Sequence, residues 1–389
     1  MLNLAGWLWH RRQLQGALVF CSRPLVLLQS DDWGRVGVRD EEGAALLRAG
    51  GVSLGERPYD FYTLETADDV IALRDLLKRH RDSTGRCACL GMNFVMANLD
   101  FAKMAAGGFE QIQLLALTEG LPGKWSRPGL FNAYRQGIAD EVFYPALHGL
   151  THFCRVPVED EITRDGKRRE LLRTLWEAET PYIHWRMPWV GYEYRNPEKP
   201  RQGFLTAEMQ TGMVQEAASL FAAFFDVPPV SACAPGYRAN RDTHAAWSKC
   251  GVRVAQNGSG TSLPPHIDDC GILNLQRTID FEPSVQELPL ETYMQLAEAS
   301  FARGVPAIIS VHAINFHSSL KDFRGPTLRT LDRFLSALER KYPDLLYVHN
   351  GDMYEIVTQG RFRSANGMVS VAIQQRDGTK SRASARSTK

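Results

Sequence analysis

Short apolar runs alternate along the chain with stretches of helical periodicity, and this alternation constrains the fold more than any other feature. Seven apolar runs of four to eight residues fit parallel strands that are buried on both faces. The segments between them predict helices, so the whole pattern predicts one α/β domain with a parallel sheet. We expect this sheet to close into a barrel, and an open doubly wound sheet is the alternative. The predicted strands are 24–29, 92–97, 142–147, 229–234, 252–256, 307–311 and 345–348.

The helical pattern is clearest over residues 67–80. Thr66 is the expected N-cap, Asp69 follows it as in a capping box, and Val70, Leu73 and Leu77 form one apolar stripe. No GxGxxG follows the first strand and no GxxxxGK[ST] occurs, so dinucleotide and P-loop nucleotide binding are not supported. The other predicted helices are 156–178, 207–225, 241–250, 289–303 and 327–341.

The charge balance excludes one class of partner. Lys plus Arg is 45 and Asp plus Glu is 44, which gives a formal net charge of +1. A nucleic-acid-binding protein needs a basic excess or patch, and none is visible here apart from the chain end. Residues 376–389 carry five basic side chains against one acidic side chain. The rest of the chain is therefore mildly acidic, and we expect no nucleic-acid partner.

The ends of the sequence and its cysteines bear on the compartment. No run of 18 or more apolar residues occurs, so we expect no transmembrane segment. The first 30 residues lack the apolar stretch and cleavage site of a signal peptide, which predicts a cytoplasmic chain. The seven cysteines are scattered and form no CxxC, which favours reduced thiols over a disulfide framework.

The composition divides the chain into three parts. We expect residues 1–23 to form an N-terminal extension, 24–357 the barrel and 358–389 a disordered basic tail. The stretch 179–205 is rich in Tyr and Trp, contains prolines and has no clean periodicity. It is predicted to be a long loop inserted into the barrel, with aromatic side chains that either stack on sugar rings or pack the insertion.

Polar residues follow several of the predicted strands directly. Asp31 and Asp32 end the first strand, and His148 and His152 follow the third in an HxxxH pattern. In α/β barrels the carboxyl ends of the strands build the site, so we expect these side chains to meet. On a helical turn two histidines at i and i+4 share one face. Two histidines and one carboxylate, with an open position for water, are the ligands of a catalytic zinc site.

The adjacent carboxylates have complementary uses. Two carboxylates after a buried strand repel each other, and a cation between them relieves that repulsion. One of Asp31 and Asp32 can bind the metal while the other accepts a proton from the activated water. The alternatives are a turn or N-cap pair of aspartates and a surface pair of histidines.

These motifs resemble those of the polysaccharide deacetylase family (the NodB-homology domain, carbohydrate esterase family four). The resemblance spans most of residues 24–357 and implies a distorted (β/α)7 barrel. It also implies that Asp31 is the general base and His312 the general acid, while Asp32, His148 and His152 bind a divalent metal, most commonly Zn²⁺. The matching segments are Ser30-Asp31-Asp32, His148-Gly149-Leu150-Thr151-His152, Ala234-Pro235-Gly236-Tyr237-Arg238 and Ser310-Val311-His312.

Two parts of the family pattern lack a clear match. The arginine that orients the base is replaced by Cys233 or Ala234, and Arg238 or Arg186 is a candidate substitute. The Asp-x-x-Asp-Trp motif that tunes the acid has no counterpart, although 266–269 lies in about the right region. His317 is the reserve for the acid role of His312.

The resemblance implies a metal-dependent deacetylase acting on an N-acetylated sugar of a polysaccharide or glycan precursor. The expected substrate-binding residues are Tyr237, Arg238, Trp185 and Trp189, and a backbone N–H near Tyr237 is expected to stabilise the oxyanion. Two alternatives remain: a non-catalytic glycan-binding barrel, and a glycoside hydrolase with paired carboxylates on a similar barrel.

Overall fold

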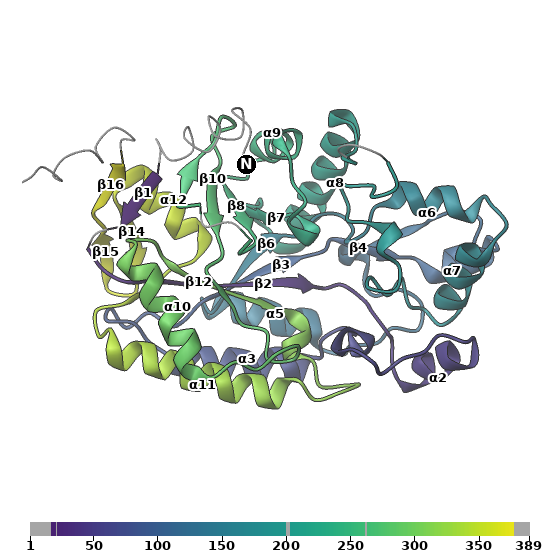
Figure 1. Cartoon of the computed structure of the whole chain (residues 1–389), viewed down its shortest axis with the longest axis horizontal. Coiled ribbons are helices and arrows are strands. Elements are labelled where there is room, and N and C mark those ends of the chain that lie inside the picture. Colours follow the sequence, from purple (N-terminus) through teal and green to yellow (C-terminus); the bar gives the residue numbers. More distant parts are fainter. Residues whose placement is uncertain (1–16, 21, 200–202, 261–262, 377–389) are drawn as a thin grey trace, which may run out of the picture.

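The computed structural model describes residues 17–20, 22–199, 203–260 and 263–376. Its centre is a 10-stranded sheet in which every pairing is parallel except that of β9 with β10. All seven predicted strands belong to this sheet, which confirms the α/β class (Figure 1). In spatial order the strands are β11 (Ile279–Asp280), β12 (Ala307–His312), β2 (Leu25–Trp33), β3 (Leu90–Phe94), β6 (Phe143–Leu147), β7 (Ser231–Cys233), β8 (Val254–Asn257), β10 (Leu273–Gln276) and β9 (His266–Ile267), and β13 (Leu346–Tyr347) also pairs with β2.

The two edges of this sheet lie close together. β10 and β11 are near opposite ends of the strand order, yet only Arg277 and Thr278 separate them in the chain. Three residue steps span at most about 11 Å, so the sheet must curl until its edges approach. The sheet is therefore a distorted barrel, as predicted, and Arg277 stands where its edges meet.

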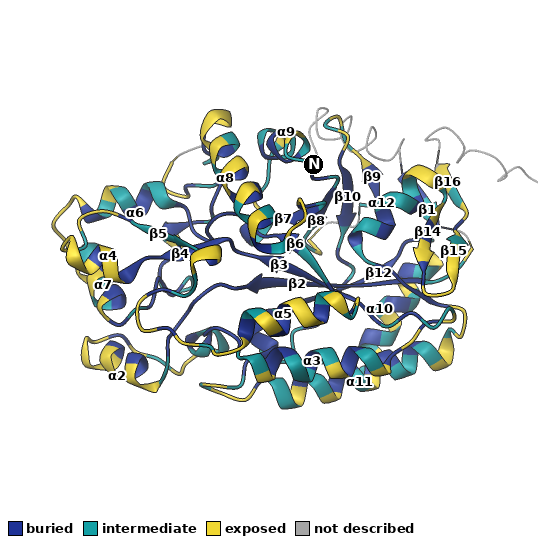
Figure 2. Ribbon diagram, turned by 180° about the vertical axis from the view of Figure 1, so that it is seen from behind, coloured by how far each residue is buried: buried dark blue, intermediate teal, exposed yellow. Residues whose placement is uncertain are grey.

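Helices cover the sheet on both sides. Figure 1 shows α3, α10 and α11 below the strands and α8 and α9 above them. Figure 2 shows that the strands are buried, while these helices turn exposed residues outward. The helices are α2 (Glu41–Ala49), α3 (Ala67–Arg79), α4 (Phe101–Ala106), α5 (Leu130–Ala139), α6 (Arg155–Ile162), α7 (Lys167–Glu177), α8 (Ala207–Phe225), α9 (Arg241–Lys249), α10 (Leu290–Ala302), α11 (Arg324–Lys341) and α12 (Asn350–Gln359).

Local chemistry explains where α3 begins. Thr66 Oγ1 accepts the Asp69 N–H at 3.2 Å, and Asp69 Oδ2 accepts the Thr66 N–H at 2.9 Å. This is the predicted capping box, and the apolar stripe of the helix is buried. The single helix predicted over 156–178 is wrong, because the chain forms α6 and α7 with a break at 163–166. Gly166 directly precedes α7, and glycine lowers helix propensity.

The predicted ends of the barrel also need correction. The expected disordered tail is wrong up to residue 376, because β14 (Arg361–Ser364), β15 (Gly367–Ser370) and β16 (Ile373–Arg376) are strands. β16 pairs antiparallel with β1 (Ala17–Phe20), which lies in the expected N-terminal extension. Backbone pairing with the apolar β1 orders the polar segment that forms β16. Residues 1–16 and 377–389 lie outside the described part.

Three smaller observations complete the fold. No helix of the described residues is long and apolar enough to cross a membrane. The six cysteines that the structure describes are free thiols, in line with the expected reduced state. A separate two-stranded antiparallel sheet pairs β4 (Ala97–Leu99) with β5 (Leu114–Ala116) beyond the end of β3.

Candidate functional site

Asp31 and Asp32 lie near the carboxyl end of β2, where the strand becomes irregular. The pairing of β2 with β3 shifts register between Ser30 and Trp33, and Asp32 has a φ of 74°. Successive side chains of a regular strand point to opposite faces. The irregularity lets both carboxylates line one pocket. Left-handed backbone at a residue other than glycine is strained, and such strain gathers at functional sites.

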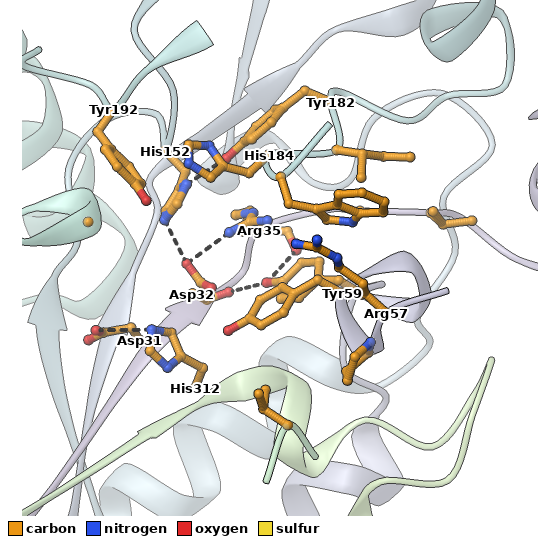
Figure 3. Close-up of a pocket in the computed structure, with 18 of the residues that line it drawn as sticks. Asp31, Asp32, Arg35, Arg57, Tyr59, His152, Tyr182, His184, Tyr192 and His312 are labelled. Carbon is orange, nitrogen blue, oxygen red and sulfur yellow. Dashed lines mark hydrogen bonds and ion pairs between the residues drawn. The ribbon is translucent and has the colours of Figure 1, made fainter. Parts of the chain in front are cut away.

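His148 and His152 meet at Asp32. The Nε2 atom of His148 lies 3.4 Å from Asp32 Oδ1. The Nε2 atom of His152 lies 3.0 Å from the same oxygen (Figure 3). His148 Nδ1 is 2.8 Å from the Cys233 carbonyl oxygen, and His152 Nδ1 is 2.5 Å from the Tyr182 hydroxyl. These contacts orient both rings. The Cys233 carbonyl can only accept, so the proton of His148 is on Nδ1 and its Nε2 is left as an acceptor or ligand.

The two histidines do not lie on a helical turn, so that part of the prediction is wrong. They belong to an irregular loop between β6 and α6. Glu193 holds this loop: its Oε1 accepts the N–H of Leu150 at 2.7 Å and that of Thr151 at 3.0 Å. Gly149 has a φ of 96°, and a Cβ there would lie 1.9 Å from Glu193 Oε2. The loop therefore needs glycine beside the buried glutamate.

Asp32, His148 and His152 fit a metal ion. One ligand atom from each lies within 4.8 Å of the others. Asp32 Oδ1 and His148 Nε2 are buried without a hydrogen-bond partner among the described residues. Burial and the nearby Arg35 lower the pKa of His152 to about 3, so its ring is neutral as a ligand must be. Two nitrogens and one oxygen are a ligand set that suits zinc.

Asp31, His148 and Cys233 form a second cluster of potential ligands, but the chemistry disfavours it. Burial raises the pKa of the Cys233 thiol well above its usual range, so the thiol stays protonated. Asp31 accepts hydrogen bonds from Arg277 and from Asn93, which occupy most of its acceptor positions. The cluster around Asp32 is therefore the better metal site.

Arg277 is the residue that orients Asp31. Its Nη1 lies 2.6 Å from Asp31 Oδ2 and its Nη2 lies 2.7 Å from Oδ1, so the pair is bidentate and buried. Burial disfavours the carboxylate, but Arg277 outweighs burial and holds the pKa of Asp31 well below its usual range. The suggested substitutes are wrong, because Arg238 is exposed and Arg186 lies nearest to Glu56 and Asp60.

Glu282 is the partner of His312. Its Oε1 lies 2.6 Å from His312 Nδ1, while His312 Nε2 lies 3.8 Å from Asp31 Oδ2. Burial favours a neutral ring, but Glu282 outweighs burial and raises the pKa of His312 to about 9. His312 is therefore protonated at neutral pH, as a general acid must be. The region 266–269 does not supply this partner, because Asp268 contacts His244 instead.

Asp31 was found because it is a polar residue at the end of a strand, and the same criterion could have found Arg277 and Glu282. Both follow strands, β10 and β11, that were not predicted because the runs are short and partly polar. The reserve acid, His317, is buried, and its Nε2 lies 3.4 Å from Glu65 rather than in the pocket.

The pocket that contains these groups has a volume of about 450 Å³, within the range of small-molecule sites. Of the expected substrate-binding residues, Tyr237 and Trp185 line it. Arg238 and Trp189 are not among its lining residues, and Trp189 packs under Arg168. The Tyr237 N–H donates to the Ala234 carbonyl at 2.8 Å, so in this conformation it is not free to bind an oxyanion.

Comparisons with known proteins bear on the fold. No family model and no curated protein matches the sequence. A "putative glycoside hydrolase/deacetylase" from Parabacteroides distasonis matches the structure with a TM-score of 0.50 and 11% identity, over 94% of this chain and 83% of that chain. A "probable Polysaccharide deacetylase" from Pseudomonas aeruginosa matches with a TM-score of 0.44 and 13% identity, over 87% of this chain and 92% of that chain. A 4-alpha-glucanotransferase from Thermococcus litoralis matches with a TM-score of 0.45 and 8% identity, over 86% of this chain and 40% of that chain.

Only the first of these three likenesses is strong enough to support a conclusion. At 11% identity it shows that this chain shares the fold of a protein described as a "putative glycoside hydrolase/deacetylase". The resemblance seen in the sequence is thereby confirmed at the level of the fold.

Proposed function

We propose that this chain, which has a polysaccharide-deacetylase-like fold, is a metal-dependent hydrolase that removes the acetyl group from an N-acetylated sugar. The observation that carries the proposal is the convergence of five groups in one pocket: a possible metal-binding triad, an ionised carboxylate and a protonated histidine. Hydrolysis of an amide needs an activated water, a base and an acid for the leaving amine.

Asp32, His148 and His152 are the residues proposed to hold the ion, with Zn²⁺ as the favoured metal. Such an ion, when bound, supplies polarisation of the acyl oxygen and of a water molecule. The residues around it prepare the ligands. Tyr182 and the Cys233 carbonyl orient the two rings, and Glu193 holds the loop that carries them.

Asp31 and His312 are proposed to move the protons. Arg277 keeps Asp31 ionised and fixes both of its oxygens, so Asp31 can take a proton from the attacking water without first losing one. Glu282 keeps His312 protonated, with Nε2 turned toward Asp31. His312 then donates this proton to the departing nitrogen. The two groups begin the reaction in the protonation states that their roles require.

The glycoside hydrolase alternative fits these groups less well. A mechanism with paired carboxylates needs one of them protonated, which requires a raised pKa. The pKa values of Asp31 and Asp32 are both lowered instead: burial opposes this, but Arg277 acts on Asp31 and Arg35 acts on Asp32. The histidine pair also has no role in that mechanism.

Metal analysis combined with an acetate-release assay tests the proposal. We expect about one divalent ion per chain in the wild type, loss of the ion in Asp32→Ala and His148→Ala, and retention of the ion in Asp31→Asn. Asp31→Asn is expected to lower the rate of acetate release by about 10²- to 10⁴-fold, because it removes the base. Arg241→Gln, an exposed ion-pair variant outside the pocket, is the matched control.

Two results would contradict the proposal. The first is a pure protein that releases acetate without any bound metal and is indifferent to chelators. The second is metal-loaded wild type that cleaves a glycan into shorter chains and releases no acetate, which would favour the glycoside hydrolase.

A further inference from the structure

The pocket has a second polar wall that the proposed chemistry does not use. Asp31 and His312 lie at the lower left of Figure 3, while Arg57 lies at the right and His184 at the upper right of the central Arg35. All five residues line the same cavity. This second wall is available to substrate atoms beyond the acetyl group.

Arg35 is a buried cation with unused hydrogen-bonding capacity. It is only 8% exposed, and its Nη1 lies 3.0 Å from Asp32 Oδ1. Its guanidinium lies over the Tyr62 ring, 4.1 Å from the centroid. Within the described residues, Arg35 Nε is buried and has no hydrogen-bond partner. A buried N–H without an acceptor is destabilising, so this edge of Arg35 calls for an acceptor from a ligand.

Two neighbouring side chains on this wall also have polar atoms available to a ligand. His184 Nδ1 is buried and lacks a partner among the described residues. Arg57 is exposed at the pocket, where its guanidinium lies 4.2 Å from the centroid of the Trp185 ring. No carboxylate in the described part of the chain forms an ion pair with Arg57. Stacking on an aromatic ring leaves the N–H groups of an arginine directed at its edge, ready for an anion.

The charges in the pocket favour the same kind of ligand. Asp31, Asp32 and Glu282 are balanced by Arg277, Arg35 and protonated His312. A divalent ion on the proposed ligands would leave an excess of two positive charges, and Arg57 adds a third. In a confined pocket such an excess attracts anions and disfavours cations.

We infer that the acetylated sugar carries an anionic oxygen group, a carboxylate or a phosphate, which binds to Arg35 and Arg57 with His184 as a further donor. Arg35 places this group beside the metal ligand Asp32, so the anion and the acyl group occupy neighbouring parts of the pocket. The inference rests on the proposed function, because it specifies the class of sugar that the same site accepts.

A set of four matched ligands tests this inference. They are N-acetylglucosamine, N-acetylglucosaminuronic acid, N-acetylglucosamine 1-phosphate and N-acetylglucosamine 6-phosphate. Their dissociation constants are measured by calorimetry on the zinc-loaded wild type, with acetate release followed in parallel. We expect at least one anionic ligand to bind about tenfold or more tightly than the neutral sugar, since hydrogen bonds to charged groups are the stronger ones. Tighter binding of the uronic acid would identify the anionic group as a carboxylate, and tighter binding of a sugar phosphate would identify it as a phosphate.

Variants then assign the preference to residues. Arg57→Gln is expected to remove most of the preference for the anion, so that the anionic and neutral sugars bind with affinities within about twofold of each other. Arg35→Gln should act in the same direction, and Arg241→Gln, outside the pocket, should have no effect. Because Arg57 is exposed, its replacement leaves the fold intact even if Arg35→Gln does not.

The outcomes separate this inference from the proposed function. Equal binding of all four ligands, binding of none, or a preference that survives Arg57→Gln and Arg35→Gln would overturn the inference. If the inference fails but the neutral sugar still releases acetate at an undiminished rate, the proposed function stands. Anion binding through Arg57 with no acetate from any ligand would contradict the proposed function and retain the anion site.

Discussion

Two ion pairs set the protonation states of the residues that we propose as base and acid. Arg277 pairs with Asp31, and Glu282 pairs with His312. An isolated charge in a buried site is unfavourable, so each group stays charged only because its partner is present. The pairs act in opposite directions on the pKa values: that of Asp31 falls and that of His312 rises. This separation is what a reaction with one base and one acid requires.

The pH dependence of activity tests the pair of Glu282 and His312. The pKa of His312 is raised to about 9, so the protonated acid is present below that pH and is lost as the pH rises through about 9. We expect kcat/KM for acetate release to fall above about pH 9. In Glu282→Gln the negative charge is gone, and the fall should begin at least one pH unit lower.

A control guards against a general effect of lost surface charge. Glu298→Gln removes an exposed partner of Lys341 and should leave the pH profile unchanged. If the descending limb stays at the same pH in Glu282→Gln, His312 is not the group whose protonation the reaction needs.

At the scale of elements, the loop after β6 decides whether the histidines can share a ligand. The buried Glu193 accepts two consecutive backbone N–H groups there, and burial raises the pKa of Glu193 to about 7. Glu193 comes from the aromatic-rich segment 179–205, which also supplies Tyr182 and His184 to the pocket. That segment is therefore both the support of the loop and a wall of the site.

Replacement of Glu193 tests this support. Glu193→Ala leaves the N–H groups of Leu150 and Thr151 without their acceptor, so the loop should lose its fixed shape. We expect zinc affinity to fall about 10- to 100-fold, as for other residues that orient metal ligands. Competition with a chelating dye gives the measurement.

Two comparisons interpret the Glu193 result. Glu193→Gln keeps a carbonyl acceptor and should retain most of the affinity, and Glu198→Ala removes only the partly exposed partner of Arg168. Equal zinc affinity in Glu193→Ala and wild type would show that the loop holds its shape without the glutamate.

At the scale of the whole molecule, the chain closes on itself in two places. The curled sheet brings β10 and β11 together at Arg277, and the ladder of β1 with β16 ties residues 17–20 to 373–376. Figure 1 places β1 and β16 at the end of the molecule opposite the arrowhead of β2, where the site lies. We therefore expect the second closure to contribute to stability without touching the site.

Truncation separates these contributions. A chain ending at residue 372 lacks β16, so β1 loses its partner strand and the backbone hydrogen bonds of that ladder. Leu18 and Phe20 keep their N–H bonds to the carbonyls of Pro265 and Gly304. We expect the midpoint of thermal unfolding to fall by about 2 °C or more relative to a chain ending at residue 376, with zinc content unchanged. Identical midpoints would show that the ladder adds no stability, and loss of zinc would show that the ends are coupled to the site.

The sequence alone determined the features that depend on neighbours along the chain. The apolar runs predicted seven strands, because strands that are buried on both faces must be apolar. The capping box at Thr66 predicted the start of α3. The position of polar residues directly after predicted strands selected Asp31, Asp32, His148 and His152. These signals are local, because periodicity and hydrogen bonds between near residues produce them.

Only the tertiary structure decided which charges meet. Arg277 reaches Asp31 across 246 residues of sequence because the sheet curls and brings its edges together. Glu282 reaches His312 across 30 residues because β11 and β12 are parallel neighbours in the sheet. The loop after β6 brings His148 and His152 to Asp32 at the end of β2, whereas Arg35 meets Asp32 from only three residues along the chain. An ion pair depends on distance in space, which no spacing in the sequence records, and burial then multiplies its strength.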